Sequence, residues 1–371
     1  MKVRLQLRRY RLPFRAPVRT AHGVWSQREG LIVRLEGEGG AVGWGEVAPI
    51  PHFGTETADE AEAAARALDE WTHAAAFAEV PERLGCLRHG LQAALREVEA
   101  QTRAAADGAE PEAVDASAPY LGVAALLPAG RAALALIEPR AEIGFRVFKW
   151  KVGVADIAEE LPLLDDVCAR LPSGAKLRLD ANGAWERRHA ERWLERCADR
   201  PVEFIEQPCL AEISAFARAI GEKVTGAQRK EMDLLLGLAE DFPTPIALDE
   251  SLVGEGDIER WVGAGWPGVY VVKPSLLGDV STAMARLAQA KAQVVFSSAL
   301  ETAVGARTAL QLAFAWKGEP AADGKTPARA LGFGVWPLFA DARFDGPGQV
   351  PFIRREDVAR MNPEAIWTAL G

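Results

Sequence analysis

The first hundred residues combine short alternating segments with longer helical ones. Apolar and polar positions alternate in three runs, residues 2–9, 30–36 and 41–47. This period of two is typical of half-exposed β-strands, and Gly37, Gly39 and Gly40 indicate a hairpin turn before the third run. From Thr57 to about Ala106 the chain is rich in alanine and glutamate, which favours helices. Strands followed by helices predict a compact α+β domain over residues 1–115.

From residue 116 the pattern changes to short β-rich runs that alternate with longer helical stretches. The predicted strands are Tyr120–Ala125, Phe145–Lys151, Lys176–Asp180, Glu203–Glu206, Ile246–Asp249, Val269–Lys273, Val294–Ser297 and Arg329–Gly332. The stretches between them have helical patterns, for example 156–170 and 303–316. Such alternation is typical of a (β/α)8 TIM barrel, an α/β fold, which we place at residues 116–338. A doubly wound open sheet is the alternative, but no GxGxxG or phosphate-loop motif supports it.

Two segments do not follow this alternation. The stretch between Glu206 and Asp249 is longer than its neighbours, and two helical patterns, Ile213–Ile220 and Met232–Leu238, predict an additional helical excursion there. No residue pattern in that stretch indicates a catalytic or binding site. Residues 339–371 follow the last predicted strand, and we expect them to pack back on the N-terminal domain.

The net charge of −9 over 371 residues argues against nucleic acid and anionic membranes as partners. The longest apolar stretch, Leu121–Ile137, is interrupted by Pro128 and Arg131 and is too short to span a bilayer. The four cysteines lack a paired metal-binding spacing, and the N-terminus lacks the apolar core of a signal peptide. We therefore expect a protein of the reducing cytoplasm, and the sequence does not predict its oligomeric state.

Charged residues stand at the ends of five consecutive predicted strands. They are Lys149 and Lys151, Asp180, Glu206, Asp249 and Lys273. Because side chains alternate along a strand, the apolar residues next to them, such as Trp150 and Leu179, would face the helices. The charged side chains would then point into the barrel, where they are costly unless they pair or bind a metal. The carboxyl ends of barrel strands are also where the active sites of such folds lie.

Three of these residues, Asp180, Glu206 and Asp249, predict an all-oxygen site for Mg²⁺, with Mn²⁺ as a substitute. The lysines of the second and sixth strands would stand on opposite sides of the molecule that the metal holds. This arrangement suits removal of a proton next to a carboxylate, because the metal and the ammonium groups offset the charge of the resulting enediolate. Neighbouring cations would also allow one lysine to act as a base near neutral pH. The expected partner is therefore a small-molecule carboxylate substrate.

At these residues the sequence resembles the enolase superfamily, in its muconate-lactonising branch. The motifs are Lys149-x-Lys151, Asp180-Ala181-Asn182, Glu206-Gln207-Pro208, Asp249-Glu250-Ser251 and Lys273-Pro274. Within that branch the chain is most similar to the o-succinylbenzoate synthase family, on segments 20–23, 43–49 and 296–302. The resemblance covers nearly the whole chain and implies a modified barrel with an N-terminal α+β capping domain. The long stretch between Glu206 and Asp249 departs from the family.

The resemblance also implies a reaction. The family dehydrates 2-succinyl-6-hydroxy-2,4-cyclohexadiene-1-carboxylate to o-succinylbenzoate, a step toward menaquinone or phylloquinone. Lys151 would remove the α-proton and protonate the departing hydroxyl, Lys273 would stabilise the enediolate from the opposite side, and Lys149 would tune Lys151. The Mg²⁺ ligands would be Asp180, Glu206 and Asp249.

Further residues are expected around the substrate. Loops near residues 18–25 and 49–55 of the capping domain would close the pocket, and their aromatic side chains suit a ring with a succinyl tail. The candidates on these loops are His22, Trp25, His52 and Phe53. Ser297 and Ser298 would donate hydrogen bonds to a substrate carboxylate, while Arg178 and Asn182 would support the site from behind. For each of these residues, ordinary packing is the alternative.

Three alternatives to this reaction can be compared with the sequence. Racemisation of N-succinylamino acids uses the same opposed lysines, metal and succinyl group, and stays open. Dipeptide epimerases of the branch carry an Asp-x-Asp in the eighth strand, which Ala330-Leu331-Gly332 lacks. A non-catalytic relic of the barrel would have lost a ligand or a lysine, yet all six are present.

Overall fold

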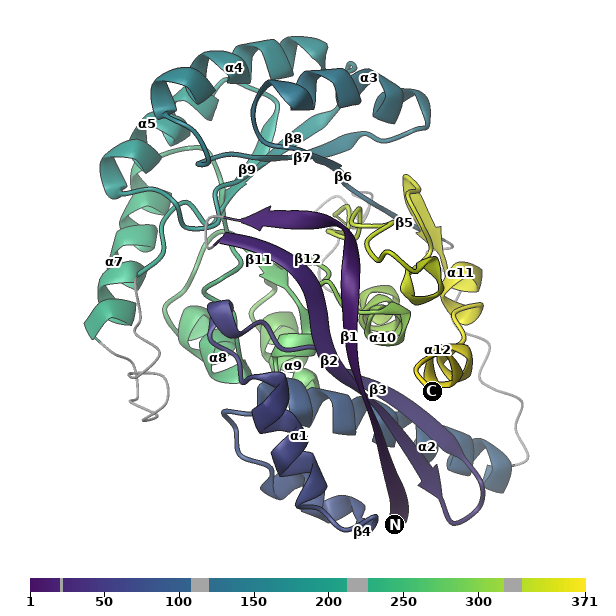
Figure 1. The fold of residues 1–371 in the computed structure, drawn as a ribbon. Coiled ribbons are helices and arrows are strands. Elements are labelled where there is room, and N and C mark those ends of the chain that lie inside the picture. Colours follow the sequence, from purple (N-terminus) through teal and green to yellow (C-terminus); the bar gives the residue numbers. More distant parts are fainter. Residues whose placement is uncertain (21–22, 108–119, 212–225, 317–328) are drawn as a thin grey trace.

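The structure of the protein, a computed structural model, describes residues 1–20, 23–107, 120–211, 226–316 and 329–371. It contains a four-stranded antiparallel sheet from the first part of the chain and a seven-stranded parallel sheet from the second (Figure 1). The predicted domain boundary between residues 115 and 116 lies outside the described residues. No described helix combines the length and the apolar character needed to cross a lipid bilayer.

Two long strands dominate the N-terminal sheet. Its order is β3-β2-β1-β4, with β1 at Lys2–Thr20, β2 at Gly23–Gly37, β3 at Val42–Val47 and β4 at Trp71–His73. The first two are longer than the alternation predicts, because their pairing continues through Pro13 opposite Gln27 and, after a register shift, through Val18 opposite Trp25. Both strands therefore extend from the N-terminal sheet toward the parallel sheet (Figure 1).

Two helices cover one face of this sheet. α1 (Ala58–Arg66) begins at a capping box, in which the Thr57 hydroxyl accepts from the backbone N–H of Glu60 and the Glu60 carboxylate accepts from that of Thr57. α2 (Gly85–Asp107) packs on β3 and β2 and helps to bury an apolar cluster that includes Leu31 and Leu87. The stretch predicted as helical thus holds these two helices, with β4 between them.

Helix α2 approaches β3 so closely that the strand requires glycine. A Cβ at Gly45 would lie 1.9 Å from the carbonyl oxygen of Gly90. Gly45→Ala is therefore expected to push the helix and the strand apart and to lower the free energy of unfolding by about 3 kcal/mol. Gly39→Ala is the matched control, because nothing lies within 4 Å of its added Cβ. Urea unfolding of both variants measures the difference, and equal stabilities would contradict the close contact.

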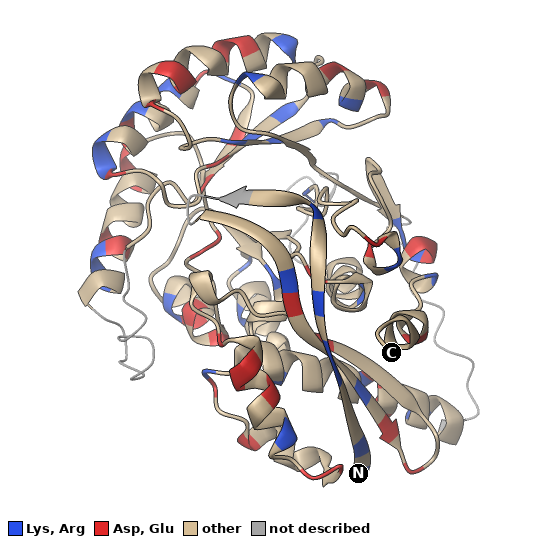
Figure 2. Ribbon diagram, in the orientation of Figure 1, with Lys and Arg blue, Asp and Glu red and all other residues tan. Residues whose placement is uncertain are grey.

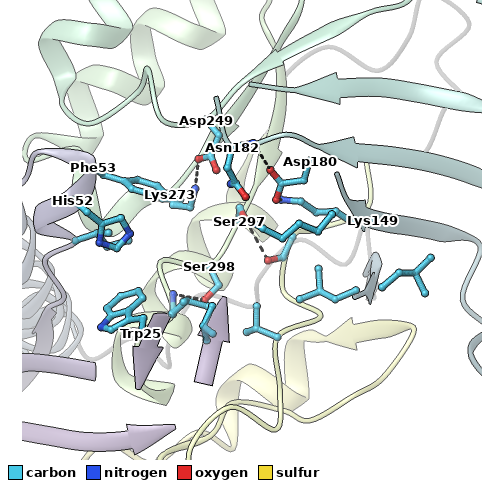
Figure 3. A pocket seen from close by; sticks show the side chains of 18 residues that line it. Trp25, His52, Phe53, Lys149, Asp180, Asn182, Asp249, Lys273, Ser297 and Ser298 are labelled. Carbon is cyan, nitrogen blue, oxygen red and sulfur yellow. Dashed lines mark hydrogen bonds and ion pairs between the residues drawn. The ribbon is translucent and has the colours of Figure 1, made fainter. Parts of the chain in front are cut away.

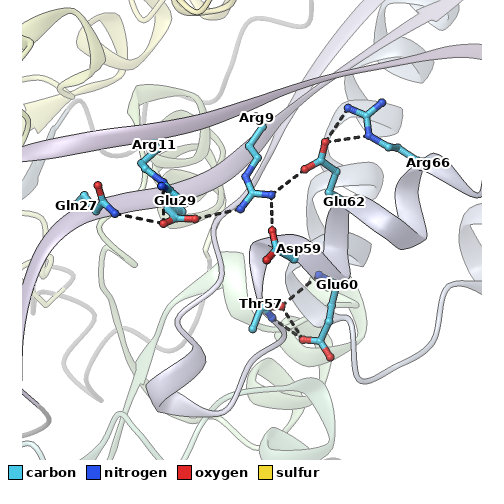
Figure 4. A network of polar contacts seen from close by, with 9 residues as sticks. All are labelled: Arg9, Arg11, Gln27, Glu29, Thr57, Asp59, Glu60, Glu62 and Arg66. Carbon is cyan, nitrogen blue, oxygen red and sulfur yellow. Dashed lines mark hydrogen bonds and ion pairs between the residues drawn. The ribbon is translucent and has the colours of Figure 1, made fainter.

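The basic residues near the start of the chain pair with acidic neighbours. The Arg9 guanidinium lies 3.0 Å from the carboxylate of Glu62 and 3.1 Å from that of Glu29, and it also pairs with Asp59 (Figure 4). Arg4 pairs with Glu70 at 2.8 Å. Figure 2 shows basic and acidic positions interspersed along the helices. Arg9 therefore links β1 to β2 and to α1.

The parallel sheet has the order β12-β11-β10-β9-β8-β7-β6, and helices cover its outer side (Figure 1). Its strands are β6 (Ala125–Leu127), β7 (Val147–Lys151), β8 (Lys176–Asp180), β9 (Val202–Glu206), β10 (Ile246–Leu248), β11 (Val269–Val272) and β12 (Gln293–Phe296). Its helices are α3 (Leu134–Glu142), α4 (Ile157–Arg170), α5 (Arg187–Cys197), α7 (Gly226–Asp241), α8 (Glu255–Gly263), α9 (Val280–Gln289) and α10 (Ala303–Ala315). The predicted α/β barrel architecture is confirmed, in a modified form.

The first and the last predicted barrel strands were wrong in detail. Residues 120–122 form β5 (Tyr120–Gly122), whose hydrogen bonds go to β13 (Phe352–Arg354), so the first parallel strand begins only at Ala125. In place of the eighth strand, the described residues contain two isolated bridges, from Leu331 to Val123 and from Gly332 to Ser297. Leu331 exchanges hydrogen bonds with Gly122 and Ala124, next to the start of β6, and Gly332 with Phe296 of β12 and with Ser298. These two residues therefore connect the two edges of the parallel sheet.

The long stretch between Glu206 and Asp249 carries α7. The helical pattern predicted at Met232–Leu238 lies within this helix, whereas Ile213–Ile220 lies outside the described residues. Glu231 of α7 accepts hydrogen bonds from Ser251 and from the backbone of Ala211, which fixes the helix beside the ends of β9 and β10.

The C-terminal segment lies against the N-terminal sheet. It includes α11 (Arg355–Ala359) and α12 (Pro363–Ala369). Phe339 forms a bridge with Phe14 of β1, and the ring of Trp367 packs on Trp44 of β3 at 5.7 Å between centroids. These contacts join the end of the chain to its beginning.

Candidate active site

Alternation along the parallel strands sorts side chains onto two faces. The apolar residues next to the charged strand ends belong to the large core between sheet and helices; they are Trp150, Leu179, Ile205, Leu248 and Val272. The opposite face carries a small separate cluster of Phe204, Ala247, Val269, Val271 and Val295. The charged residues continue this second face at the carboxyl ends of the strands.

A cavity of about 210 Å³ opens at these strand ends (Figure 3). The residues singled out in the sequence that line it are Trp25, His52, Phe53, Lys149, Lys151, Asp180, Asn182, Asp249, Lys273, Ser297 and Ser298. Apolar side chains complete the lining. Val18 and Ile50 belong to the two stretches that were expected to close the pocket, whereas no sequence pattern pointed to Leu126, Leu300 and Val335. The cavity therefore combines a charged floor with apolar and aromatic walls.

Three other candidate residues do not line the cavity. Glu206 lies beneath it and is 2% exposed. Arg178 lies further down the same strand as Asp180, where it donates to Glu203 at 2.7 Å and to the carbonyl of Ala330 at 2.7 Å. It therefore joins β8 to β9 and to the segment that closes the sheet. His22 lies outside the described residues.

The three carboxylates form ion pairs with two lysines. The Lys149 ammonium lies 2.7 Å from Glu206 Oε1 and 3.0 Å from Asp180 Oδ2. Lys273, which follows β11, donates to Asp249. The two ammonium groups reach the carboxylates from opposite sides (Figure 3).

The charges in this cluster shift each other's pKa values. Burial lowers the pKa of Lys149, but the charges of Asp180, Glu206 and Asp249 outweigh it, and the net shift is upward. Burial raises the pKa of Glu206, and the two neighbouring carboxylates raise it further against the effect of Lys149. The site therefore holds a concentration of buried carboxylates that favours additional positive charge.

The donor chemistry of the cluster fits a hard divalent cation. Within the described residues, no three Asp, Glu, His or Cys side chains surround a common point, because ammonium groups lie between the carboxylates. The carboxylates nevertheless come from the ends of adjacent strands, and oxygen donors of this kind are preferred by Mg²⁺. Asn182 Oδ1 and Glu250 Oε2 are also buried and accept no hydrogen bond from the described residues. Such atoms suit the water molecules that Mg²⁺ retains.

Two residues that the sequence offered only as parts of motifs position this site. The Gln207 amide oxygen accepts from the backbone N–H of Asp249 at 2.9 Å and of Ser251 at 3.2 Å, so it fixes the turn that follows β10. Glu250 accepts from the Asn182 amide at 2.8 Å. Both lie directly after a strand-end carboxylate and are buried, and a polar residue at such a position is the signal that points to them.

Aromatic residues from the N-terminal part of the chain form one wall of the cavity. The ring of Trp25 lies 5.3 Å from that of His52, which lies 5.1 Å from that of Phe53. The Lys273 ammonium lies 5.1 Å from the centroid of the Phe53 ring. Arg28 is buried next to Trp25 and donates to the backbone oxygens of Pro49 and Ala299. This arginine therefore joins the aromatic wall to the loop after β12.

Comparison with known proteins agrees with this architecture. Residues 132–332 match the family model described as enolase C-terminal domain-like, and residues 2–98 match that of the MenC N-terminal domain. The o-succinylbenzoate synthase of Thermosynechococcus vestitus is 37% identical over 338 residues, which cover 90% of this chain and 92% of the relative.

Solved structures give the same result. The crystal structure of o-succinylbenzoate synthase from Thermosynechococcus elongatus BP-1, complexed with Mg in the active site, superposes with a TM-score of 0.72 at 35% identity and covers 91% of this chain and 94% of the other. The L-Ala-D/L-Glu epimerase from Bacillus subtilis shares the fold with a TM-score of 0.74 at 21% identity, covering 95% and 96% of the two chains. By sequence and by fold, the chain belongs to the o-succinylbenzoate synthase family of the enolase superfamily.

Proposed function

We propose that the protein is a hydro-lyase that converts 2-succinyl-6-hydroxy-2,4-cyclohexadiene-1-carboxylate to o-succinylbenzoate, in the cytoplasm, for menaquinone or phylloquinone biosynthesis. The observation that carries the proposal is the cavity, in which lysines from β7 and from the end of β11 flank buried carboxylates. Membership of the o-succinylbenzoate synthase family supports this reaction over others on the same fold.

Lys151 carries the proton transfers. Its side chain lines the cavity from the end of β7. It removes the proton from the ring carbon that bears the carboxylate, and the electron pair of the C–H bond passes into the enediolate. It then returns a proton to the hydroxyl that leaves from the adjacent ring carbon as water, so both transfers occur on one face of the ring. The new double bond makes the ring aromatic.

Lys273 and Lys149 supply positive charge to this reaction. Lys273 faces the cavity between Asp249 and the ring of Phe53, and it offsets the charge of the enediolate from the side opposite Lys151. Lys149 is held between Asp180 and Glu206 and keeps a positive charge next to the base. Its role is to tune Lys151 rather than to exchange protons with the substrate.

Asp180, Glu206 and Asp249 would hold Mg²⁺, with Mn²⁺ as a substitute. When bound, the metal supplies a Lewis acid for the substrate carboxylate. The Mg in the active site of the solved relative supports this assignment. Asn182 and Gln207 hold the backbone and side chains around these ligands in place.

The walls of the cavity suit the rest of the substrate. Trp25, Phe53 and Leu126 offer apolar contact to the ring, while Ser297 and Ser298 offer hydroxyl groups to a carboxylate. A succinyl-bearing ring needs both kinds of surface.

The test is steady-state turnover of the purified protein with and without Mg²⁺, on the cyclohexadiene carboxylate and on N-succinylphenylalanine in parallel. We expect fast, metal-dependent aromatisation of the first compound and slow or no racemisation of the second. The opposite ratio would make the protein an N-succinylamino acid racemase with the same cavity. No turnover of either compound would overturn the proposal.

A further inference from the structure

A buried carboxyl group behind Ser298 has no part in the reaction described above. Glu301 lies between β12 and α10 and is 0% exposed. Its Oε2 atom lies 3.2 Å from the Ser298 hydroxyl oxygen, while its Oε1 atom accepts no hydrogen bond from the described residues. Ser298 lines the cavity. We propose that Glu301 sets the direction of the Ser298 hydroxyl and thereby makes the affinity of the cavity for a carboxylate depend on pH.

The hydrogen bonds around Ser298 allow two states. The backbone N–H of Leu300 donates to the Ser298 hydroxyl oxygen at 2.9 Å (Figure 3). This bond does not depend on the protonation of Glu301. When Glu301 is ionised, the Ser298 proton points to Glu301, and the remaining lone pair of the hydroxyl is left for the cavity. When Glu301 is protonated, Glu301 donates to Ser298, and the Ser298 proton is free to point to a carboxylate in the cavity. The protonated state therefore binds a carboxylate better.

The carboxylate of Glu46 lies near Glu301 and makes the ionisation of Glu301 costly. Glu46 of β3 accepts four hydrogen bonds on its two oxygens, as a carboxylate does. The donors are the Tyr10 hydroxyl at 2.6 Å, the Thr302 hydroxyl at 2.6 Å, and the backbone N–H groups of Thr302 at 2.9 Å and of Gly305 at 2.8 Å. A Cβ at Gly305 would lie 2.9 Å from Glu301 Cγ and 3.0 Å from Glu46 Oε2, so both side chains crowd the first turn of α10.

The one basic group that we find facing Glu301 among the described residues is Arg28 of β2. Its guanidinium donates to the backbone oxygens of Leu300 at 3.1 Å, of Ala299 at 3.3 Å, and of Pro49 and Glu29. Because these oxygens take its hydrogen bonds, Arg28 forms no ion pair with Glu301. Tyr10 of β1 also faces this carboxyl group, and burial raises its pKa well above the usual range, so it stays neutral.

The surroundings place the change of state near neutral pH. Burial, together with the charge of Glu46, raises the pKa of Glu301 to about 7, against the effect of Arg28 and of nearby backbone amides. The protonated form of Glu301 is the one that leaves the Ser298 proton free for a substrate carboxylate. The affinity of the cavity for the carboxylate is therefore full below the raised pKa of Glu301 and is lost as the pH rises above it. The neutral fraction falls about tenfold between about pH 6 and about pH 8, and we expect KM for the substrate to rise by the same factor.

The inference rests on the proposed function, in which Ser298 contacts the substrate carboxylate, and the experiment separates the two. KM and kcat are measured across this pH range in the Mg²⁺-supplemented enzyme for the wild type, Glu301→Gln and Ser298→Ala. Glutamine cannot ionise and donates to Ser298 at every pH, so the rise of KM should vanish in Glu301→Gln. It should also vanish in Ser298→Ala, whose KM is raised throughout. The dependence of kcat on pH should be the same in all three, because none of the changes touches the lysines or the carboxylates of the reaction.

Glu97→Gln is the matched control. Glu97 is also a mostly buried carboxyl group whose pKa burial raises, but it pairs with Arg307 and lies away from the cavity. This variant should keep the tenfold rise of KM. A rise that persists in Glu301→Gln or in Ser298→Ala would overturn the proposal, and so would its loss in Glu97→Gln.

The protonation of Glu301 can also be measured without turnover, so the inference can be tested even if the proposed reaction is wrong. Infrared difference spectra between wild type and Glu301→Gln isolate the carbonyl band of a protonated Glu301 from those of other buried carboxyl groups. We expect this band at about pH 6, and its loss by about pH 8, when the raised pKa has been passed. Absence of the band at the lower pH would contradict the inference, whatever reaction the enzyme catalyses.

Discussion

Lys151→Ala is expected to lower kcat for the dehydration at least about ten-thousand-fold, because one side chain supplies both the base and the acid of the reaction. Mg²⁺ affinity should change little, since Asp180, Glu206 and Asp249 all remain. Measurements of kcat, together with titration of the protein with Mg²⁺ by calorimetry, give the two quantities separately.

Lys176→Ala is the control for this variant. Lys176 is an exposed lysine at the start of β8, far along the sheet from the cavity, so its removal tests for a general effect of lost charge. It should leave kcat near the wild-type value. Substantial turnover by Lys151→Ala would mean that another group takes the proton, and Lys273 would then be the first to examine.

Replacement of Glu206 by glutamine is expected to lower Mg²⁺ affinity and activity together, each by about 100-fold. The variant loses one anionic ligand and also the carboxylate that lies 2.7 Å from the Lys149 ammonium. Excess Mg²⁺ should restore part of the activity, because the other two carboxylates still bind. The dependence of the rate on Mg²⁺ concentration measures both effects.

Glu203→Gln controls for the loss of a carboxylate on the same strand. Glu203 pairs with Arg178 and Arg329 at the opposite end of β9. Its replacement should lower the free energy of unfolding without a change in Mg²⁺ affinity. If Glu206→Gln bound Mg²⁺ as tightly as the wild type, Glu206 would be removed from the set of ligands.

Five of the barrel strands, β7 to β11, could be predicted from the sequence because each has apolar residues that face the helices and a charged residue at or just after its carboxyl end. Trp150 and Leu179 face helices, and the lysines and carboxylates beside them have no apolar role to explain them. The edges of the sheet could not be predicted in the same way. The sequence of residues 120–122 is typical of a strand but does not show with which strand they pair. Their partner is β13, which lies more than two hundred residues later in the chain.

The charged residues of the candidate site could also be predicted from the sequence, because charged side chains that point into a packed barrel are costly unless they pair or bind a ligand. The apolar residues of the cavity wall could not be predicted. In the sequence, Leu126, Leu300 and Val335 do not differ from ordinary core residues, and only the structure shows that they line the cavity. Glu301 was hidden for a further reason. Its environment is created by Glu46 and Arg28 of the N-terminal sheet, and no local pattern around residue 301 reports them.

The long second strand of the N-terminal sheet limits how this cavity can evolve. Trp25 in the cavity wall and Leu31 in the core beneath α2 lie on β2, on the same side of a strand whose successive side chains alternate. Insertion or deletion of one residue between them would turn one of the two to the wrong face. New substrate preferences can therefore arise on this strand by substitution alone. Changes in length are better tolerated in β1 between Pro13 and Val18, where the pairing already shifts register.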